Sequence, residues 1–251
     1  MASVKTKTVL KAKSFSKSTF KYFAEAKKVK SKNLKSQQDW FLKNKNQYIE
    51  TVKSPFENLL IELQKKLQKE LPDLRIDHKL VTRPTRPAHK AAEGFVKNFS
   101  YATITEKRSS LFEWNPGIHI QFGGEKDDNF IGCGLYMVSG RQISQLRNAL
   151  ATDYDTIHSI LNNKKFKTTW GALRGEMYVR APKGFALDQP YSKLLMHKQF
   201  YVHREYKMTE ITSQKFADTV IADLKIIMPF FKWIRESVGT YKKTSTKNYD
   251  L

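Results

Sequence analysis

The segments GIHIQF (residues 117–122) and FIGCGLYM (residues 130–137) decide the fold class of this 251-residue chain. Apolar and polar residues alternate in the first segment, and the second is short, apolar and rich in β-branched and aromatic residues, which is typical of β-strands. Gly123 and Gly124, followed by acidic residues, are typical of a hairpin turn. We therefore expect two antiparallel strands here.

Further strands and helices are expected on both sides of this hairpin. Aromatic and β-branched runs predict strands at residues 75–82, 100–105, 176–179 and 200–206. Apolar residues at helical spacing predict helices at residues 18–30, 37–53, 55–71, 139–150, 154–161 and 216–238. Ser54 and Pro55 indicate a fresh helix start, and Pro229 is expected to bend the last helix. The order favours an α+β fold, in which a mostly antiparallel sheet is flanked by N-terminal and C-terminal helices.

The composition is that of one globular domain between two basic ends. Apolar residues make up 40% of the chain, enough to bury a sizeable core. We expect a flexible basic arm at residues 1–14, a domain at residues 15–239 and a frayed basic tail at residues 240–251. The single cysteine, Cys133, indicates a reducing, cytoplasmic location, and no apolar run is long enough for a membrane span.

The charge is the strongest functional signal in the sequence. Forty-five Lys and Arg residues against 24 Asp and Glu residues give a formal net charge of +21. Residues 1–36 contain eleven lysines and one acid, which gives +10 and leaves +11 for the remainder. An excess of this size is typical of proteins that bind nucleic acid or another polyanion, although a basic arm can also serve only solubility.

Several motifs occur in an order that resembles a known family. They include Trp40-Phe41 with Asn44-Lys45 and Tyr48, then Pro55-Phe56, Gly132-Cys133-Gly134-Leu135-Tyr136, the helix holding Arg147, and Arg180-Ala181-Pro182-Lys183-Gly184-Phe185 followed by Asp188 and Pro190. Between about Phe15 and Val238, the chain is similar to domain-of-unknown-function family 2461. The resemblance implies a single α+β domain and no established activity.

One stretch departs from the pattern of that family. Relatives usually carry Arg-Asp, then Arg-Phe and a lysine, where this chain has Arg83-Pro84-Thr85-Arg86-Pro87 and Lys90. Pro84 thus replaces the acidic residue, while the basic residues are kept. A carboxylate that served as general base or metal ligand in relatives is lost here, whereas binding of an anion is unaffected.

Two basic loops are the candidate binding residues. Arg83, Arg86 and Lys90 lie in a proline-containing loop, and Arg180 and Lys183 lie beside proline and glycine in another. Guanidinium groups on a stiff backbone bind phosphate or carboxylate with little ordering cost. We expect both loops to contact one anionic ligand, the alternative being that the arginines pair with nearby acids such as Glu113, Glu125 or Asp188 and hold the loops in place.

Other chemistry finds little support in the sequence. The six histidines show no metal-ligand spacing, and no motif for a cofactor or a nucleophile occurs, so we expect neither metal nor cofactor. His119 and Arg147 are possible polar site residues, His119 because it alternates with Ile118 and Ile120. A surface histidine without a role is the alternative.

Three classes of function fit these observations. The first, which we favour, is a protein without evident catalysis that binds nucleic acid or ribonucleoprotein. The second is an enzyme that holds a phosphorylated or carboxylated small molecule in an arginine-lined pocket, with His119 in acid–base catalysis. The third is a structural or assembly protein that docks on an acidic partner through an exposed apolar patch. The oligomeric state is not predicted.

Overall fold

The structure is a computed structural model that describes residues 14–107, 115–180, 182–185 and 188–239. The predicted tail and almost all of the predicted arm lie outside these residues. In the described part of the chain, five strands form one antiparallel sheet in the order β1-β2-β3-β4-β5. The strands are β1 (Leu74–Arg75), β2 (Phe99–Glu106), β3 (Gly117–Gly123), β4 (Phe130–Leu135) and β5 (Phe200–Glu205). This arrangement confirms the α+β fold class.

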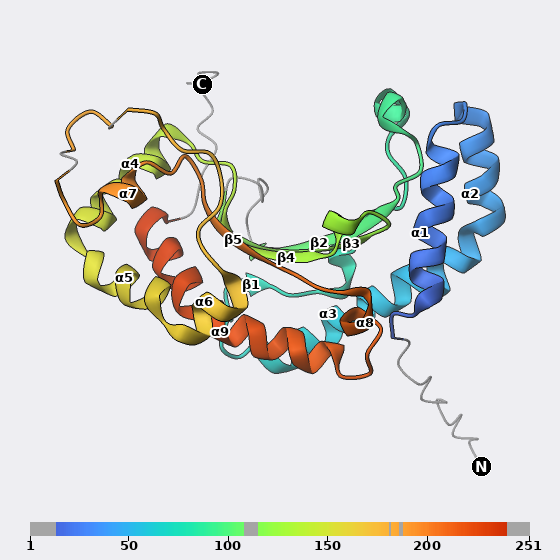
Figure 1. Cartoon of the computed structure of the whole chain (residues 1–251). Helices are drawn as coiled ribbons and strands as arrows, with labels where there is room; N and C mark the ends of the chain where they lie inside the picture. Colours follow the sequence, from blue (N-terminus) through green and yellow to red (C-terminus); the bar gives the residue numbers. More distant parts are fainter. Residues whose placement is uncertain (1–13, 108–114, 181, 186–187, 240–251) are drawn as a thin grey trace, which may run out of the picture.

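Along the chain, helices precede the first strand, occur between strands and follow the last strand (Figure 1). Their bounds are α1 (Lys17–Lys30), α2 (Leu34–Tyr48), η1 (Ile49–Lys53), α3 (Ser54–Leu67), η2 (His78–Leu80), η3 (Ala88–Glu93), η5 (Lys126–Asp128), α4 (Gly140–Thr152), α5 (Tyr154–Asn162), α6 (Lys164–Trp170), α7 (Ser192–Leu195), α8 (Met208–Ile211) and α9 (Phe216–Val238). The predicted cap of α4 is confirmed, since Ser139 and Gln142 form a capping box.

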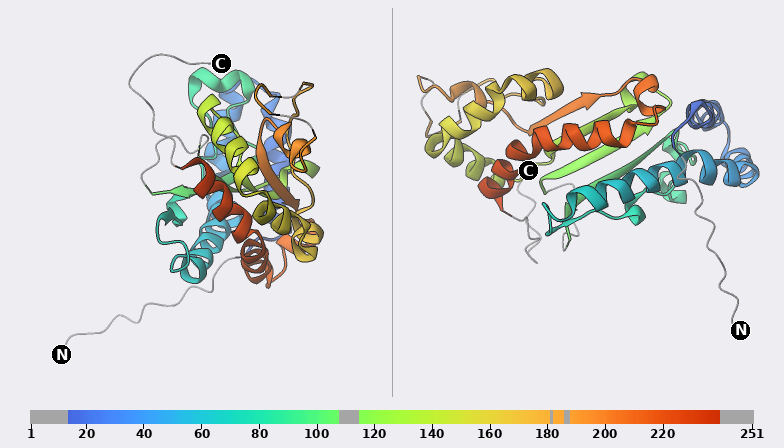
Figure 2. Two further views of the ribbon diagram at one scale, coloured as in Figure 1. Left: turned by 90° about the vertical axis from the view of Figure 1, so that its left-hand side faces the viewer. Right: turned by 90° about the horizontal axis from the view of Figure 1, so that it is seen from below.

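One face of the sheet is covered, and the core lies there. Helices α3 and α9 run side by side across this face (Figure 2). Alternate strand residues point into the core between sheet and helices, among them Ile104, Ile120, Phe122, Ile131 and Val202, all fully buried. Because successive side chains of a strand point to opposite faces, the intervening residues all lie on the other face. We call that side the open face.

The expected break at Ser54 is wrong. Ser54 has helical dihedral angles, and its N–H bonds to the carbonyl of Ile49, five residues back, so the π-helical turn η1 joins α2 to α3 without interruption. Pro55 follows directly and has no N–H of its own to place. The wide turn thus accommodates Pro55, which lacks an N–H to donate. Helix α9 also continues through its proline, Pro229.

Two predicted strands are much shorter in the structure. Of the segment 75–82, only Arg75 belongs to a strand, together with Leu74 before it, and the chain then turns into η2, where Asp77 accepts a hydrogen bond from the N–H of Lys79. The segment 176–179 makes a single bridge, Met177 to His197. Both segments lie at the edges of the sheet. Most of their β-branched and aromatic residues belong to loops that border the open face and not to strands.

Candidate functional site

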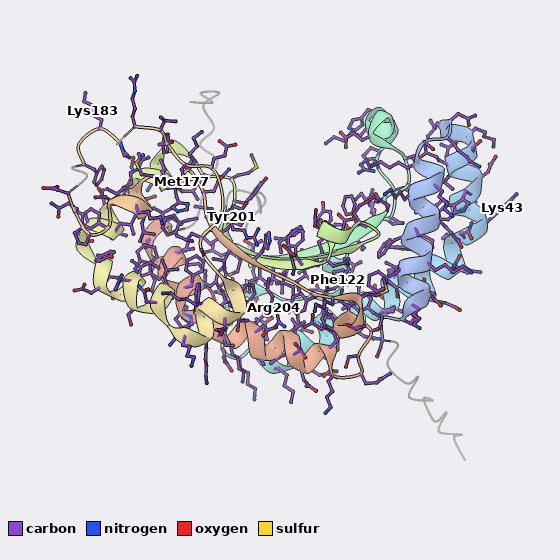
Figure 3. All side chains as sticks on the ribbon, in the orientation of Figure 1. Lys43, Phe122, Met177, Lys183, Tyr201 and Arg204 are labelled. Atoms are coloured by element: carbon purple, nitrogen blue, oxygen red, sulfur yellow. The ribbon has the colours of Figure 1, made fainter. Side chains whose placement is uncertain are left out.

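The open face carries a large cavity formed by described residues. Its volume is about 490 Å³, and it is lined by Tyr101, Thr103, Asn115, Gly117, His119, Phe130, Gly132, Cys133, Gly134, Tyr136, Met137, Tyr201 and His203. Figure 3 shows Tyr201 on this side of the sheet and Arg204, the third residue after it, on the side of α9. The lining is largely aromatic and apolar, with a few polar groups, as in most ligand sites.

Aromatic rings form a continuous row across four strands of the open face. We call this set the ring row: Phe99 and Tyr101 on β2, His119 on β3, Phe130 on β4 and His203 on β5. Successive ring centroids are 6.1, 5.0, 5.7 and 5.4 Å apart. The antiparallel register brings these rings together, since Tyr101 pairs with Gln121 and Gln121 with Phe130. All five side chains are half-buried and leave part of each ring accessible.

A chain of hydrogen bonds fixes the proton of His119. Nε2 of Gln121 donates to Oδ1 of Asp128 over 3.2 Å, so its Oε1 is left to accept from Nε2 of His119 at 3.5 Å. Nδ1 of His119 then carries no proton and accepts from the hydroxyl of Thr103, 3.0 Å away. Burial lowers the pKa of His119 below its usual 6.5, opposed by the bond to Gln121. The imidazole is therefore neutral at pH 7.

The half-buried imidazole of His119 predicts a pH-dependent stability. Between the lowered pKa of folded His119 and 6.5, the unfolded chain binds more protons, so stability is present above pH 6.5 and is lost as pH falls through the folded pKa. We expect His119→Gln to lose less unfolding free energy than wild type between pH 7 and pH 5. Urea denaturation at both pH values measures this, with His158→Gln, exposed on α5, as control. Equal losses in wild type and His119→Gln would contradict it.

The second histidine of the cavity, His203, lies on β5, two strands away from His119 on β3. Gly132 on β4 pairs with His119 on one side and with His203 on the other. A Cβ at Gly132 would lie 3.7 Å from Cε2 of Phe130 and 3.7 Å from the carbonyl oxygen of Val202, so the ring of Phe130 packs over this position at contact distance. Nε2 of His203 lies 3.3 Å from Oε1 of Glu205. Burial and Arg174 lower the pKa of His203, and Glu205 opposes this change. The two imidazoles thus flank the ring of Phe130, 5.7 and 5.4 Å from its centroid, and both line the cavity.

Cations border the open face at both ends. At the β2 end, Nζ of Lys97 lies 5.4 Å from the centroid of Tyr101, and burial, followed by Arg86, lowers its pKa. At the β5 end, the N–H of Arg174 bonds to the carbonyl of Tyr201, and its guanidinium lies 3.7 Å from Glu205. The residues of the open face between Lys97 and Arg174 are uncharged at pH 7, except for carboxylates that already have partners.

The first predicted basic loop lies at the β2 end. Arg83 and Lys90 are exposed, with Lys90 in η3. Arg86 is held by its own loop: its guanidinium donates to the carbonyl of Gly94 over 2.8 Å, lies 3.3 Å from Glu93 and covers the ring of Phe99. These contacts of Arg86 are those of an arginine that holds its own loop in place, which was the alternative to anion binding. A role for Arg83, Arg86 and Lys90 in anion binding stays a prediction.

The second basic loop lies at the opposite end, beside α4 and α7 (Figures 1 and 3). Arg180 and Lys183 are exposed there. The guanidinium of Arg147 lies 5.0 Å from the ring centroid of Tyr178, and among the described residues its buried Nε finds no hydrogen-bond partner. β2 and β5 are three strand spacings apart, roughly 14 Å. The structure therefore does not bring the two loops together, and only an extended ligand could touch both.

Most of the open-face residues were missed from sequence alone. Of the predicted site residues, only His119 lies in the cavity. The signal that could have found the others is alternation: Tyr101 and Thr103, like Tyr201 and His203, occupy every second position of a strand. Glu113, one of the acids considered as a partner of the loop arginines, lies outside the described residues.

Comparison with known proteins identifies a family and nothing more specific. Within the described ranges, the structure shows no cluster of three or more His, Cys, Asp or Glu side chains suited to a metal ion. Its described helices are all too short or too polar to span a bilayer. Neither a curated protein nor a solved structure matches the chain. The sequence model of the family described as conserved hypothetical protein, DUF2461, matches residues 18–233, most of the chain. The chain therefore belongs to the DUF2461 family.

Proposed function

We propose that this protein binds single-stranded nucleic acid on its open face, with bases stacked on the ring row. The observation that carries the proposal is the continuity of that row, whose centroids follow at 5.0–6.1 Å over four strands. Every base presents a π-face, so stacking on aromatic side chains tolerates any sequence. A sheet face of accessible rings is a recurring platform for single strands, whose bases are free to splay out.

The charge distribution supports the same ligand. Lys97 and Arg174 stand at the two ends of the face, where the backbone of a strand crossing the sheet would enter and leave. A second cavity, of about 220 Å³, shares Tyr101 and Thr103 with the first and is also lined by Arg75 and Lys107. The two cavities therefore adjoin each other at Tyr101 and Thr103. The net charge of +21 adds sequence-independent affinity for phosphate.

Binding to labelled single strands tests the proposal. We expect fluorescence anisotropy to show binding of mixed-sequence 15-mers that weakens steeply with salt, and weaker binding of duplex. Tyr101→Ala and Phe130→Ala should each cost about 1–3 kcal/mol of binding free energy, since each removes one stacking platform. Phe41→Ala is the matched control, because Phe41 is a half-buried ring on α2, outside the cavity.

Charge variants and a deletion separate the open face from the basic arm. Lys97→Gln should reduce the salt dependence more than Lys66→Gln, which changes an exposed lysine of α3 on the covered side. The proposal fails if deleting residues 1–13 abolishes binding while the Tyr101 and Phe130 variants bind like wild type. It also fails if neither RNA nor DNA single strands bind at all.

A further inference from the structure

We propose that the amine of Lys97 captures abasic sites in a bound single strand, by forming an imine with the C1′ aldehyde that a lost base leaves behind. This inference rests on the proposed function, since the open face must first hold the strand. It adds a covalent step that intact nucleotides do not undergo, because their C1′ carries a base and is no aldehyde.

A short backbone ladder fixes the position of Lys97. Residues 84–86 run antiparallel to residues 95–97, and the N–H of Lys97 donates to the carbonyl of Pro84 over 2.9 Å. From this ladder the side chain extends over Tyr101, and its Nζ lies 5.4 Å from the centroid of that ring. Tyr101 belongs to the ring row and lines both cavities. The amine is therefore presented to a strand on the open face by a rigid support.

The surroundings of Lys97 are those of a nucleophilic lysine. The side chain is half-buried, and among the described residues its Nζ has no ion-pair partner. Lys198, which is also half-buried, instead lies 2.8 Å from Glu176. Burial, followed by Arg86, lowers the pKa of Lys97. Loss of water and a neighbouring cation both favour the neutral amine, which is the form that attacks a carbonyl.

Arg86 stays beside Lys97 because its own loop holds it. Its guanidinium donates to the carbonyl of Gly94 over 2.8 Å and covers the ring of Phe99. Glu93 lies 3.3 Å from the same guanidinium, but its side chain is exposed, so water weakens its field at Lys97. The positive charge that favours a neutral Lys97 is thus a fixed part of the site.

A missing base gives this amine access to the reacting carbon. In an intact strand, the base stacked on Tyr101 displaces Nζ of Lys97 from the ring and separates it from the sugar. Where the base is lost, the ring stays uncovered, and the opened sugar brings its aldehyde to the place where Nζ already lies. The rings of Phe99 and His119, centred 6.1 and 5.0 Å from that of Tyr101, remain available to the neighbouring bases.

The proposed step balances without an oxidant or any further reactant. The lone pair of the Lys97 nitrogen attacks C1′ and forms a carbinolamine. The aldehyde oxygen then leaves as water together with the two hydrogens of the amine, and the nitrogen and C1′ are joined by a double bond. Addition of water reverses the step and releases the strand.

Reduction with borohydride tests this step, because it converts the imine into a stable amine. The full chain, incubated with a single-stranded DNA 15-mer that has one central abasic site, should give a covalent product on a denaturing gel. Peptide mapping by mass spectrometry should locate the adduct on Lys97. A strand with tetrahydrofuran in place of the abasic sugar has no aldehyde, and it should bind without forming an adduct.

A charge-conserving variant separates capture from binding. Lys97→Arg keeps the positive charge but has no neutral amine, so the trapped yield should fall about tenfold or more, while the tetrahydrofuran strand binds within a few-fold of wild type. Lys66→Arg, at an exposed position of α3, should be trapped like wild type.

A wild-type yield from Lys97→Arg overturns the inference, as do adducts spread over other lysines. Wild-type protein that binds the abasic strand and forms no adduct overturns it as well. Each of these results would leave the proposed binding function standing. Absence of binding to any single strand would remove both the function and the inference.

Discussion

Gly134→Ala is expected to lower the free energy of unfolding by about 3 kcal/mol or more, which is a large part of the stability of an ordinary domain. Gly134 lies in β4 with φ +132°, a conformation that residues with a Cβ rarely adopt. An added Cβ would also overlap the carbonyl oxygen of Phe200 and lie 2.7 Å from Cα of Tyr201, both backbone atoms of β5 that cannot move aside. Urea denaturation followed by tryptophan fluorescence measures the loss.

Gly132→Ala is the matched control for this prediction. The two glycines are neighbours on the same strand face, but Gly132 has an ordinary φ and a Cβ there meets nothing closer than 3.7 Å. We expect its stability to stay within about 1 kcal/mol of wild type. Equal stability of Gly134→Ala and Gly132→Ala would show that the backbone conformation at Gly134 does not require glycine.

Asp223→Ala is expected to cost about 3–5 kcal/mol, because it removes a buried carboxylate that half-buried Arg204 and the buried hydroxyl of Tyr206 share, and leaves Arg204 with Glu210 alone. Oδ2 of Asp223 accepts from Nη1 of Arg204 and, over 2.8 Å, from the hydroxyl of Tyr206. Nη2 of Arg204 also bonds to Glu210 over 2.9 Å. Burial raises the pKa of Asp223, while Tyr206 and Arg204 oppose that rise. This network joins β5, α8 and α9 under the sheet.

A double-mutant cycle shows whether the ion pair itself carries the effect. Arg204→Met removes the charge but keeps an apolar chain of similar length, so the double variant Arg204→Met/Asp223→Ala should recover part of the loss. Asp218→Ala, an exposed carboxylate near the start of α9, should change stability by less than about 0.5 kcal/mol. If Asp223→Ala and Asp218→Ala have equal effects, the network does not stabilise the fold.

The fold class could be predicted because its signals are local. Alternation in GIHIQF, the capping box at Ser139 and the apolar spacing of residues 216–238 each act within a few residues, and the structure confirms all three elements. The break expected at Ser54 failed because a π-helical turn carries the helix past Pro55, although serine followed by proline is also the signal of a helix start. The short helices α6, α7 and α8 have too few residues to show a period and were not predicted.

The site could not be predicted to the same extent, since it depends on pairing between distant segments. A single sequence does not tell which face of a sheet is covered, and the ring row reaches His203 only because β4 pairs with β5 across residues 136–199. Charge directed attention to Arg83 and Arg180, which lie at opposite ends of the open face. His119 was found through alternation, but its partner across Gly132 required the register.

The connection from β4 to β5 has a consequence for how the protein could acquire a new ligand. Residues 136–199 leave the sheet at the end of β4, and the chain returns as β5, which pairs with β4. This excursion supplies α4 to α7 together with Tyr178 and Arg174. Insertions or replacements within the excursion would reshape one wall of the binding surface while the antiparallel floor keeps its pairing. Specificity and folding are thereby encoded in separable stretches of the gene, and relatives that share this floor are free to diverge in what they recognise.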